Sequence, residues 1–322
     1  MRIDLDAAAA FLREHDRYLI LSHSHPDGDT VGSAAALCHA LRALGKRART
    51  GCSDPVSATF AYITGELPDD DFEPETLVAV DVAAAYMLGS DLGPRANEVA
   101  LCIDHHPSNE QYAQRLLLEE DSAAAAEIVY ELVELLGVPV SRPIAEALYT
   151  GIATDTGCFR YANTTPRTHL FAAKTMQAGA RADMINSVNF VMKSRTRVRL
   201  EQELLSTIEY YYGGRVSVMH LSQAMLAAAG ASSSDADSLA YLTRQVVGVD
   251  VGLLFKETPE GGQKVSVRSN ECCDSSLLCR HFGGGGHRFA SGCAFDTDFP
   301  SARDAMLRVI GEMLGETERP EE

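Results

Sequence analysis

Short apolar runs alternate with helical patterns through the first half of the chain. Three runs, at 18–21, 77–80 and 99–103, are continuous enough to predict strands that are buried on both faces. Apolar residues recur at helical spacing in the segments 5–14, 32–44, 123–136, 142–154, 165–179 and 182–189. A further strand is expected at 47–52. Strands that alternate with helices predict an α/β domain with a parallel sheet.

The pattern changes in the last third of the chain, where predicted strands are separated more often by turns. The expected elements are a hairpin over 208–221 that turns at Gly213-Gly214, a helix at 238–246, strands at 249–256, 263–268 and 293–295, and a helix at 302–314. This order predicts a smaller, mixed-sheet α/β domain. We therefore expect a first domain at 1–188, a helical connector at 189–205 and a second domain at 206–322. The acidic stretches 68–75 and 316–322 are expected to be solvated.

The composition is typical of a soluble globular protein of about two domains. The chain has 322 residues, of which 46% are hydrophobic and 23% are charged. The formal net charge of −17 argues against binding to duplex nucleic acid, which requires a basic surface. The one basic cluster, at 193–199, is interpreted as the solvated face of the connecting helix. Eight cysteines without a CxxC pair, and no secretory or membrane-spanning pattern, predict reduced, mostly buried thiols in a cytoplasmic protein outside the membrane.

Residues with metal-binding chemistry gather where the predicted strands end. They are His23, Asp27 and Asp29 in the turn after the first strand, Asp81 after the second, Asp104, His105 and His106 after the third, and Asp155 farther on. The carboxyl ends of parallel strands face the crevice in which open α/β sheets bind ligands. Mixed carboxylate and imidazole donors favour manganese, iron, cobalt or zinc over magnesium or calcium. Ordinary use of aspartate in turns and helix caps is the alternative, but four separate segments would have to imitate one constellation.

These donors are numerous enough for two cations that share a carboxylate. Two divalent ions about 3.5–4 Å apart can activate a hydroxide and stabilise an in-line displacement at phosphorus. Four carboxylates would balance the charge of two such ions, so an anionic phosphate needs further support. Arg268, His106 and the glycine amides before His287 are candidates for that support, the amides as an anion nest.

Together these motifs resemble the DHH phosphoesterase superfamily. Its four motifs match His23-x-x-Pro26-Asp27-x-Asp29, Asp81, Asp104-His105-His106 and Asp155. In the second domain, Val265–Ser269 and Gly284-Gly285-Gly286-His287 resemble the DHH-associated domain with its GGGH loop. The order and size of these parts are similar to the bacterial nanoRNase and pAp phosphatase family, and the resemblance covers nearly the whole chain.

The resemblance implies a role for each motif residue. One metal ion would be held by His23, Asp27 and Asp81, and a second by Asp29, Asp81, His105 and Asp155, with Asp81 bridging. His106 would contact the scissile phosphate and protonate the leaving oxygen, while Asp104 would steer an imidazole as the other catalytic residue. Substrate would be bound, at its end remote from the metals, by Arg268, Ser269, Gly284, Gly285, Gly286 and His287.

The resemblance also implies a reaction and its setting. Members of the family are typically manganese-dependent, cytoplasmic and dimeric through the first domain, and their GGGH loop closes the cleft between the domains. The expected reaction is hydrolysis of short oligoribonucleotides (nanoRNA) or 3′-phosphoadenosine 5′-phosphate (pAp), by two-metal hydroxide attack on phosphorus. We expect two Mn²⁺ ions and a homodimer.

Several alternatives stay open from the sequence. A linear dinucleotide hydrolase acting on pApA-type products is close, because its substrate differs little from a two-nucleotide RNA. A single-strand exonuclease would want a charged groove with aromatic platforms, which 7% aromatic residues and the absence of tryptophan do not favour. Inorganic pyrophosphatases share a related first domain but have no GGGH loop. A non-catalytic nucleotide-binding regulator would have no obvious use for eight retained donors.

Overall fold

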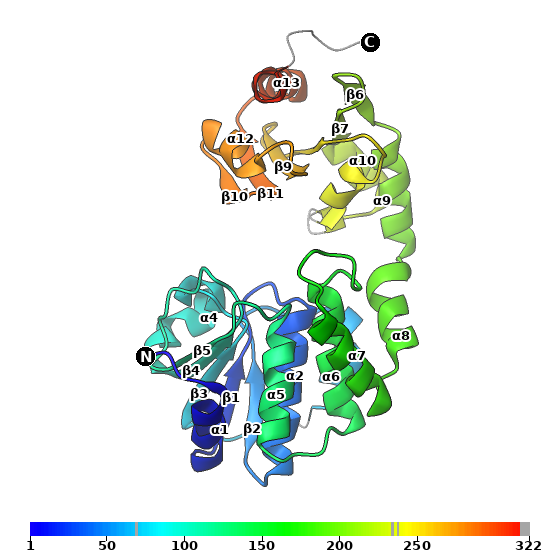
Figure 1. The fold of residues 1–322 in the computed structure, drawn as a ribbon. Coiled ribbons are helices and arrows are strands. Elements are labelled where there is room, and N and C mark those ends of the chain that lie inside the picture. The colour runs from blue at the N-terminus through cyan, green and yellow to red at the C-terminus, as the bar shows by residue number, and fades with distance from the viewer. Residues whose placement is uncertain (68–69, 233–234, 237, 316–322) are drawn as a thin grey trace. The chain divides into compact units, whose positions relative to one another are not determined.

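A computed structural model describes residues 1–67, 70–232, 235–236 and 238–315 of the chain. The chain divides into two compact units, Met1–Met192 and Lys193–Glu322, which are described separately below (Figure 1). The predicted acidic tail at 316–322 lies outside the described residues, as do positions 68–69 of the predicted acidic loop.

The first unit is built on a five-stranded parallel sheet with the order β2-β1-β3-β4-β5. Its strands are β1 (Tyr18–Leu21), β2 (Ala48–Gly51), β3 (Thr76–Val80), β4 (Val99–Asp104) and β5 (Leu116–Leu118). The chain leaves β1 for β2 on one side and returns to β3 on the other side. The strand order therefore reverses at β1, and ligands of open α/β sheets bind at such a switch point.

Helices cover one face of this sheet, and short turns of helix cover the other (Figure 1). The long helices are α1 (Leu5–Glu14), α2 (Gly28–Ala43), α5 (Ala125–Leu135), α6 (Arg142–Asp155) and α7 (Pro166–Gln177), and the short elements η1 (Ala58–Phe60), α3 (Ala61–Thr64), α8 (Ala182–Asn186) and the π-turn η4 (Ser187–Val191) lie on their side. The short helices of the other face are η2 (Ala85–Leu88), α4 (Gly89–Leu92) and η3 (Gly93–Glu98). Strand residues alternate between the two cores: Ile20 and Val78 pack against the long helices, and Leu19 and Leu77 against the short ones.

The second unit carries a six-stranded mixed sheet with the order β10-β11-β9-β8-β7-β6. Its strands are β6 (Glu209–Tyr211), β7 (Val216–Leu221), β8 (Val251–Glu257), β9 (Gln263–Ser269), β10 (Gly285–His287) and β11 (Ala290–Phe295). Its helices are α9 (Arg195–Leu205), α10 (Gln223–Ala229), η5 (Ser238–Arg244), α12 (Ser275–His281) and α13 (Phe299–Leu314). A parallel sheet in the first unit and a mixed sheet in the second, shorter unit confirm the predicted fold class.

The structure corrects several predicted elements. Helix α2 begins at Gly28 and not at 32, because the Asp27 side chain caps it there. The glycine run was expected to be a loop, but Gly285–His287 pairs with β11 as strand β10. The Gly213-Gly214 hairpin turn is longer than two residues, since Tyr211 pairs with Val216. Several short elements were not predicted, namely β5, η1, α3, η2, α4, η3, α10 and α12, and the predicted helix 182–189 divides into α8 and the π-turn η4.

Two further observations concern the chain as a whole. None of the helices among the described residues is both long enough and apolar enough to cross a membrane. All eight cysteines are free thiols, five of them buried and Cys272 exposed.

Candidate metal centre

Three neighbouring parallel strands carry the predicted ligands to one edge of the first sheet. Asp81 directly follows β3, His105 directly follows β4, and the turn that starts at Ser22 follows β1. Asp81 has a φ of 61°, a left-handed conformation in which aspartate is better tolerated than most residues. The sharp turn at Asp81 places its carboxylate beside His23, which follows β1, and His105, which follows β4.

The turn after β1 is fixed by the start of helix α2. The Asp27 carboxylate accepts hydrogen bonds from the amides of Asp29 (3.0 Å) and Thr30 (3.1 Å), as an N-cap does. The Thr30 hydroxyl donates to the carbonyl of Val80 (3.0 Å), which ties the helix to the end of β3. Asp29 therefore lies in the first helical turn, with only 1% of its surface exposed.

A first group of metal-type donors consists of His23, Asp27 and Asp81, whose candidate ligand atoms lie within 4.8 Å of one another. The Nε2 atom of His23 lies 3.7 Å from a carboxylate oxygen of Asp27 and 3.7 Å from Oδ2 of Asp81. The other ring nitrogen, Nδ1, bonds the carbonyl of Ser24 at 2.7 Å. Because Nδ1 is engaged, Nε2 is the nitrogen that faces the carboxylates.

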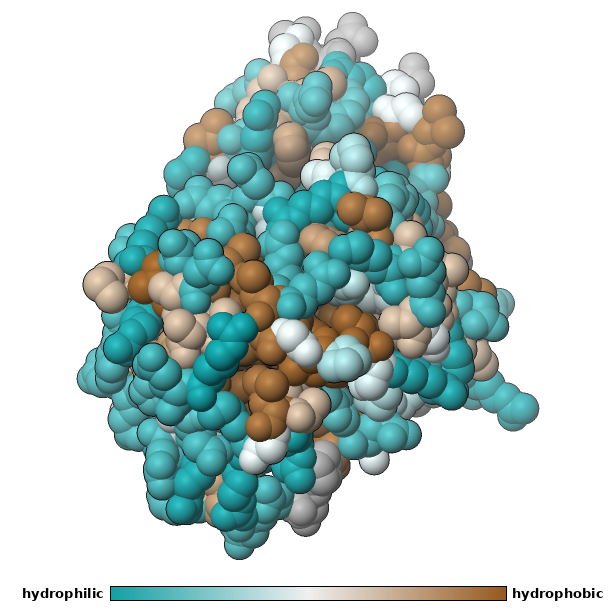
Figure 2. Space-filling model, turned by 60° about the horizontal axis from the view of Figure 1, so that its bottom comes forward, coloured by the Kyte–Doolittle hydropathy of each residue, from teal (hydrophilic) through white to brown (hydrophobic). Residues whose placement is uncertain are grey.

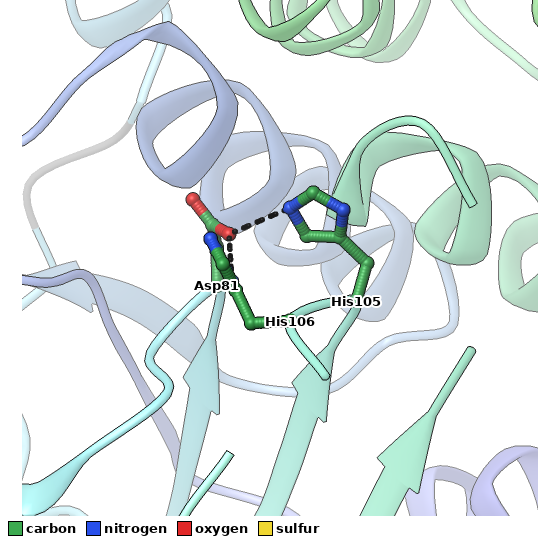
Figure 3. A group of neighbouring side chains, drawn as sticks. All are labelled: Asp81, His105 and His106. Atoms are coloured by element: carbon green, nitrogen blue, oxygen red, sulfur yellow. Dashed lines mark ion pairs between the residues drawn. The ribbon is translucent and has the colours of Figure 1, made fainter. Parts of the chain in front are cut away.

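A second group consists of Asp29, His105 and Asp155. Nε2 of His105 lies 4.0 Å from Asp29 and 3.6 Å from Asp155, while its Nδ1 bonds the carbonyl of Ser122 at 3.0 Å. Asp81 links the two groups, since its Oδ2 faces His23 and its Oδ1 lies 3.5 Å from Nε2 of His105 (Figure 3). The structure thus brings all six predicted ligands into two adjoining sets that meet at Asp81.

His106 faces the same carboxylate but is held differently. Its Nδ1 lies 2.8 Å from the buried Asp104 carboxylate and 3.5 Å from Asp81 (Figure 3). Asp104 also accepts from the amides of His105 and His106 and, at 2.6 Å, from the side chain of Asn109. The hydrogen bond from His106 to Asp104 raises the pKa of His106. Asp104 keeps a lowered pKa because these donors outweigh the effect of its burial.

The crowding of carboxylates raises the pKa values of three further groups, Asp81, Asp155 and His23. Burial, then the charges of Asp29 and Asp27, raise the pKa of Asp81 well above its ordinary value. Burial and Asp29 raise the pKa of Asp155 to about 7. For His23 burial acts downward, but the nearby carboxylate of Asp27 raises the pKa to about 9. In such a cluster the carboxylates repel one another unless positive charge lies among them.

The buried atoms at the centre of the cluster lack ordinary partners. Oδ1 of Asp81 and Nε2 of His105 are buried, and neither has a hydrogen-bond partner among the described residues. Leaving such groups unpaired costs about 1–3 kcal/mol each, and more for charged ones. Carboxylate oxygens and imidazole nitrogens that converge without bonding one another fit the coordination of divalent transition metals. The residues present therefore fit a pair of divalent cations.

His25, the other histidine of the turn, lies apart from both groups. Its side chain is 93% exposed, and its Nδ1 is 3.3 Å from Asp54, which also accepts from the His25 amide at 2.8 Å. No local pattern marks Asp54 as a contact of this turn, because Asp54 lies 29 positions after His25.

The predicted substrate-binding residues of the second unit lie at one end of its sheet. Ala290 of β11 pairs with Arg268 of β9 on one side and with His287 of β10 on the other. Residues directly opposite one another in antiparallel strands share a face, so Arg268 and His287 lie on the same face, flanking Ala290. Ser269 faces the other way and is 1% exposed, with its hydroxyl 3.3 Å from the carbonyl of Arg288.

Gly284, Gly285 and Gly286 shape the approach to His287. A Cβ at Gly284 would lie 2.2 Å from the carbonyl oxygen of Gly292, so only glycine fits there. Gly286 has a φ of 138° and pairs with Ser291, and Gly285 pairs with Gly292. This strand and its exposed residues replace the predicted loop of free amides.

Sequence reasoning missed the residues that hold the ligands from behind. The amides of Ala125 and Ala126 donate to Asp29 at 2.6 and 3.0 Å, Asn109 bonds Asp104, and Asn163 bonds the carbonyl of Asp155 at 3.2 Å. Ala125 and Ala126 lie at the start of α5, where helix amides have no intrahelical partner. A predicted helix start near 123 was the only available signal for them.

Known proteins share both the motifs and the fold. The model of the DHH family, N-terminal domain, matches residues 17–152. The chain is 34% identical over 300 residues to the bifunctional oligoribonuclease and PAP phosphatase NrnA of Thermus thermophilus, an alignment that covers 92% of this chain and 89% of that relative.

Two solved structures share its architecture. An exopolyphosphatase-related protein from Bacteroides fragilis has a TM-score of 0.84 at 22% identity, covering 97% of this chain and 95% of that one. Exonuclease RecJ bound to manganese has a TM-score of 0.52 at 15% identity, covering 98% and 95%. At these identities the structures establish the fold. The match of the DHH family model and the extended match to the Thermus relative show that the chain belongs to the DHH phosphoesterases and is a hydrolase of the family of bifunctional oligoribonucleases and PAP phosphatases.

Proposed function

We propose that this protein hydrolyses short oligoribonucleotides and pAp with two divalent cations, Mn²⁺ being the expected ion. The observation that carries the proposal is the pair of donor groups joined through Asp81. The curated relative named as an oligoribonuclease and PAP phosphatase supports the choice of substrates. The manganese-bound RecJ structure, which shares the fold, supports the choice of ion.

The two donor groups divide the six ligands between the cations. His23, Asp27 and Asp81 would hold one ion, and Asp29, Asp81, His105 and Asp155 the other. Two such ions would polarise the phosphoryl oxygens and generate a hydroxide nucleophile near neutral pH. Their positive charge would also offset the burial and the carboxylate repulsion that raise the pKa values of Asp81 and Asp155.

His106 is the group proposed to carry a proton. Its Nδ1 is engaged by Asp104, so Nε2 is the ring nitrogen left to contact the substrate, and 39% of its side chain is exposed. Asp104 favours the protonated imidazole, as a carboxylate beside a catalytic histidine does. We assign His106 the role of contacting the scissile phosphate and protonating the leaving oxygen.

Substrate binding away from the cations is assigned to the second unit. Arg268 and His287 share one face of its sheet, and His287 is exposed. A guanidinium is suited to paired contacts with a phosphate or a base edge, and an imidazole can stack or donate. The glycine strand beside His287 leaves backbone uncovered by side chains, which allows close approach of a nucleotide. Ser269 is assigned a supporting role because its side chain is buried.

The charge of the protein favours short substrates over long ones. Proteins that track long single strands combine a positively charged groove with stacking aromatics. A chain with net charge −17 and no tryptophan lacks that general attraction, so local recognition must suffice. Two- to five-nucleotide RNAs and pAp are substrates that a local site can hold.

A side-by-side assay tests the proposal. Metal-stripped protein would be given Mn²⁺ and one of pAp, two- to five-nucleotide RNAs, pApA or pyrophosphate, with Asp81→Ala as the matched inactive control. We expect turnover of short RNA and pAp, and its loss in Asp81→Ala. A preference for pApA above all others would favour the linear-dinucleotide alternative, and long single strands as best substrates would favour an exonuclease. Substrate binding without turnover would favour a regulator.

The first domain is also proposed to mediate a homodimer. Figure 2 shows an apolar patch with polar side chains around it on one face of the molecule. Large exposed apolar residues of the first unit include Leu170 and Met176, each more than half exposed. Such patches are a recurring feature of protein interfaces. Light scattering during size-exclusion chromatography would measure about twice the 34.7 kDa chain mass for a dimer.

A further inference from the structure

One short segment contacts two of the three donors in the second group. Between β5 and α5, the carbonyl of Ser122 bonds Nδ1 of His105 at 3.0 Å. At the start of α5, the amides of Ala125 and Ala126 donate to the two carboxylate oxygens of Asp29 at 2.6 and 3.0 Å. A shift of this segment would therefore move His105 and Asp29 together.

Ala123 lies between these contacts, and side chains bond both its backbone amide and its backbone carbonyl. Its amide donates to the buried carboxylate of Glu127 at 3.4 Å. Its carbonyl accepts from Nδ2 of Asn163 at 3.0 Å, and the same Nδ2 donates to the carbonyl of Asp155 at 3.2 Å. Only the amide nitrogen of an asparagine can bond two carbonyl oxygens, so the orientation of the side chain is settled by its partners.

Asn163 thus connects the segment that holds His105 and Asp29 to the backbone of the third donor, Asp155. The loop between Asp155 and Asn163 needs such a tie. Gly157, Cys158 and Phe159 have φ values of 55°, 59° and 62°, and a left-handed conformation is costly for the two that are not glycine. A loop of this kind keeps its shape only when its surroundings hold it.

We propose that Asn163 is a positioning residue for the Asp29–His105–Asp155 cation site alone. The His23–Asp27–Asp81 group is held by other contacts, those of His23 with Ser24 and of Asp27 with the first amides of α2. Loss of the Asn163 amide should therefore loosen one cation site and leave the other unchanged. The inference rests on the proposed two-cation function.

Calorimetric titration of metal-stripped protein with Mn²⁺ tests the inference in two single-site backgrounds. His23→Ala leaves the second group intact, and Asp155→Ala leaves the first. Adding Asn163→Ala should weaken Mn²⁺ binding about 10–100-fold in the His23→Ala background, the usual effect of removing a group that orients a ligand. It should change binding less than twofold in the Asp155→Ala background.

Two controls separate positioning from general loosening. Asn189→Ala also removes an amide with two hydrogen bonds in the first unit, to Tyr62 and the Ile185 carbonyl, and should leave both affinities unchanged. Asn163→Leu keeps the approximate size of the side chain but removes the Nδ2 donor, so it should weaken Mn²⁺ binding as Asn163→Ala does. Thermal unfolding in chelator confirms that each variant is folded.

The outcomes are distinct for the two proposals. Wild-type protein that binds fewer than two Mn²⁺ ions contradicts the proposed function. Wild-type protein that binds two ions, with Asn163→Ala weakening neither site or both equally, overturns the role of Asn163 and leaves the proposed function standing. If Asn189→Ala weakened Mn²⁺ binding as much as Asn163→Ala does, the positioning role of Asn163 would also be overturned.

Discussion

Mn²⁺ should stabilise the first unit against unfolding while leaving the second unit unchanged. All the metal-type donor groups found among the described residues lie within Met1–Met192. In the absence of a cation, the first unit must keep Asp81 and Asp29 buried beside each other, and burial raises the pKa of both. Cations bound only by the folded first unit would shift its unfolding equilibrium by mass action.

The size of the effect follows from ligand linkage. At a free Mn²⁺ concentration 100 times the dissociation constant, each ion adds about 2.7 kcal/mol to the free energy of unfolding. Two ions therefore add about 5 kcal/mol. For a unit of this size, each kcal/mol raises the melting temperature by about 2–4 °C, so we expect a rise of about 10–20 °C.

Differential scanning calorimetry in chelator and in Mn²⁺ would measure this shift, with Asp81→Asn as the informative variant. Because the pKa of Asp81 is raised in the folded protein, its ionisation near pH 7 opposes folding. Asp81→Asn should therefore raise the melting temperature in chelator and remove most of the gain in Mn²⁺. No shift in the wild type, an equal shift of both units, or a less stable metal-free Asp81→Asn would refute the reasoning. Complete unfolding of wild type in chelator would make the cations structural.

Three other predictions concern single side chains. Burial acts to raise the pKa of Glu146, but Arg181 and Arg142 lower it, so the stabilising effect of its charge is present above about pH 4.5 and is lost as the pH falls through the folded pKa. Glu146→Gln should therefore flatten the acid limb of a melting-temperature profile. Glu98→Gln, which removes an exposed ion pair with Arg95, should flatten it much less. Gly32→Ala would place a Cβ 2.3 Å from the carbonyl oxygen of Ala147 and should cost about 1–3 kcal/mol in urea unfolding, whereas Gly93→Ala, with its nearest atom at 3.9 Å, should be near neutral. Arg268→Ala should raise KM for dinucleotides and pAp far more than for a small chromogenic phosphodiester, and equal effects would exclude a role in binding the nucleotide.

The ligand-bearing strand ends could be predicted because their signal is local. An apolar run that stops on a carboxylate, as at Asp81 and at Asp104, is visible within a few positions of the chain. Parallel strands then bring such ends to one edge of the sheet, whatever the loops between them do. The two donor groups can therefore be predicted from the pattern. The structure adds that one carboxylate oxygen of Asp81 faces His23 and the other faces His105.

The remaining parts depend on partners that are distant in sequence. Asn163 contacts Ala123 from 40 positions away, and nothing around Asn163 marks it. The glycine run is expected to be a loop because glycine disfavours strands, yet pairing with β11 makes Gly285–His287 a strand. The start of α2 at Gly28 is different, because the Asp27 side chain bonds the amides of Asp29 and Thr30, which is a local contact that the sequence can indicate.

The second ring nitrogen of each histidine distinguishes the proposed ligands from the proposed proton carrier. His23 and His105 both donate through Nδ1 to backbone carbonyls, which leaves Nε2 to face a cation. His106 engages the Asp104 carboxylate instead, and a carboxylate stabilises the charged imidazolium far more than a carbonyl does. The adjacent His105 and His106 therefore suit different proposed roles, cation binding and proton transfer, because Nδ1 of His105 bonds a carbonyl and Nδ1 of His106 bonds a carboxylate. Replacing Asp104 by asparagine should remove that difference, so proton transfer should suffer more than Mn²⁺ binding.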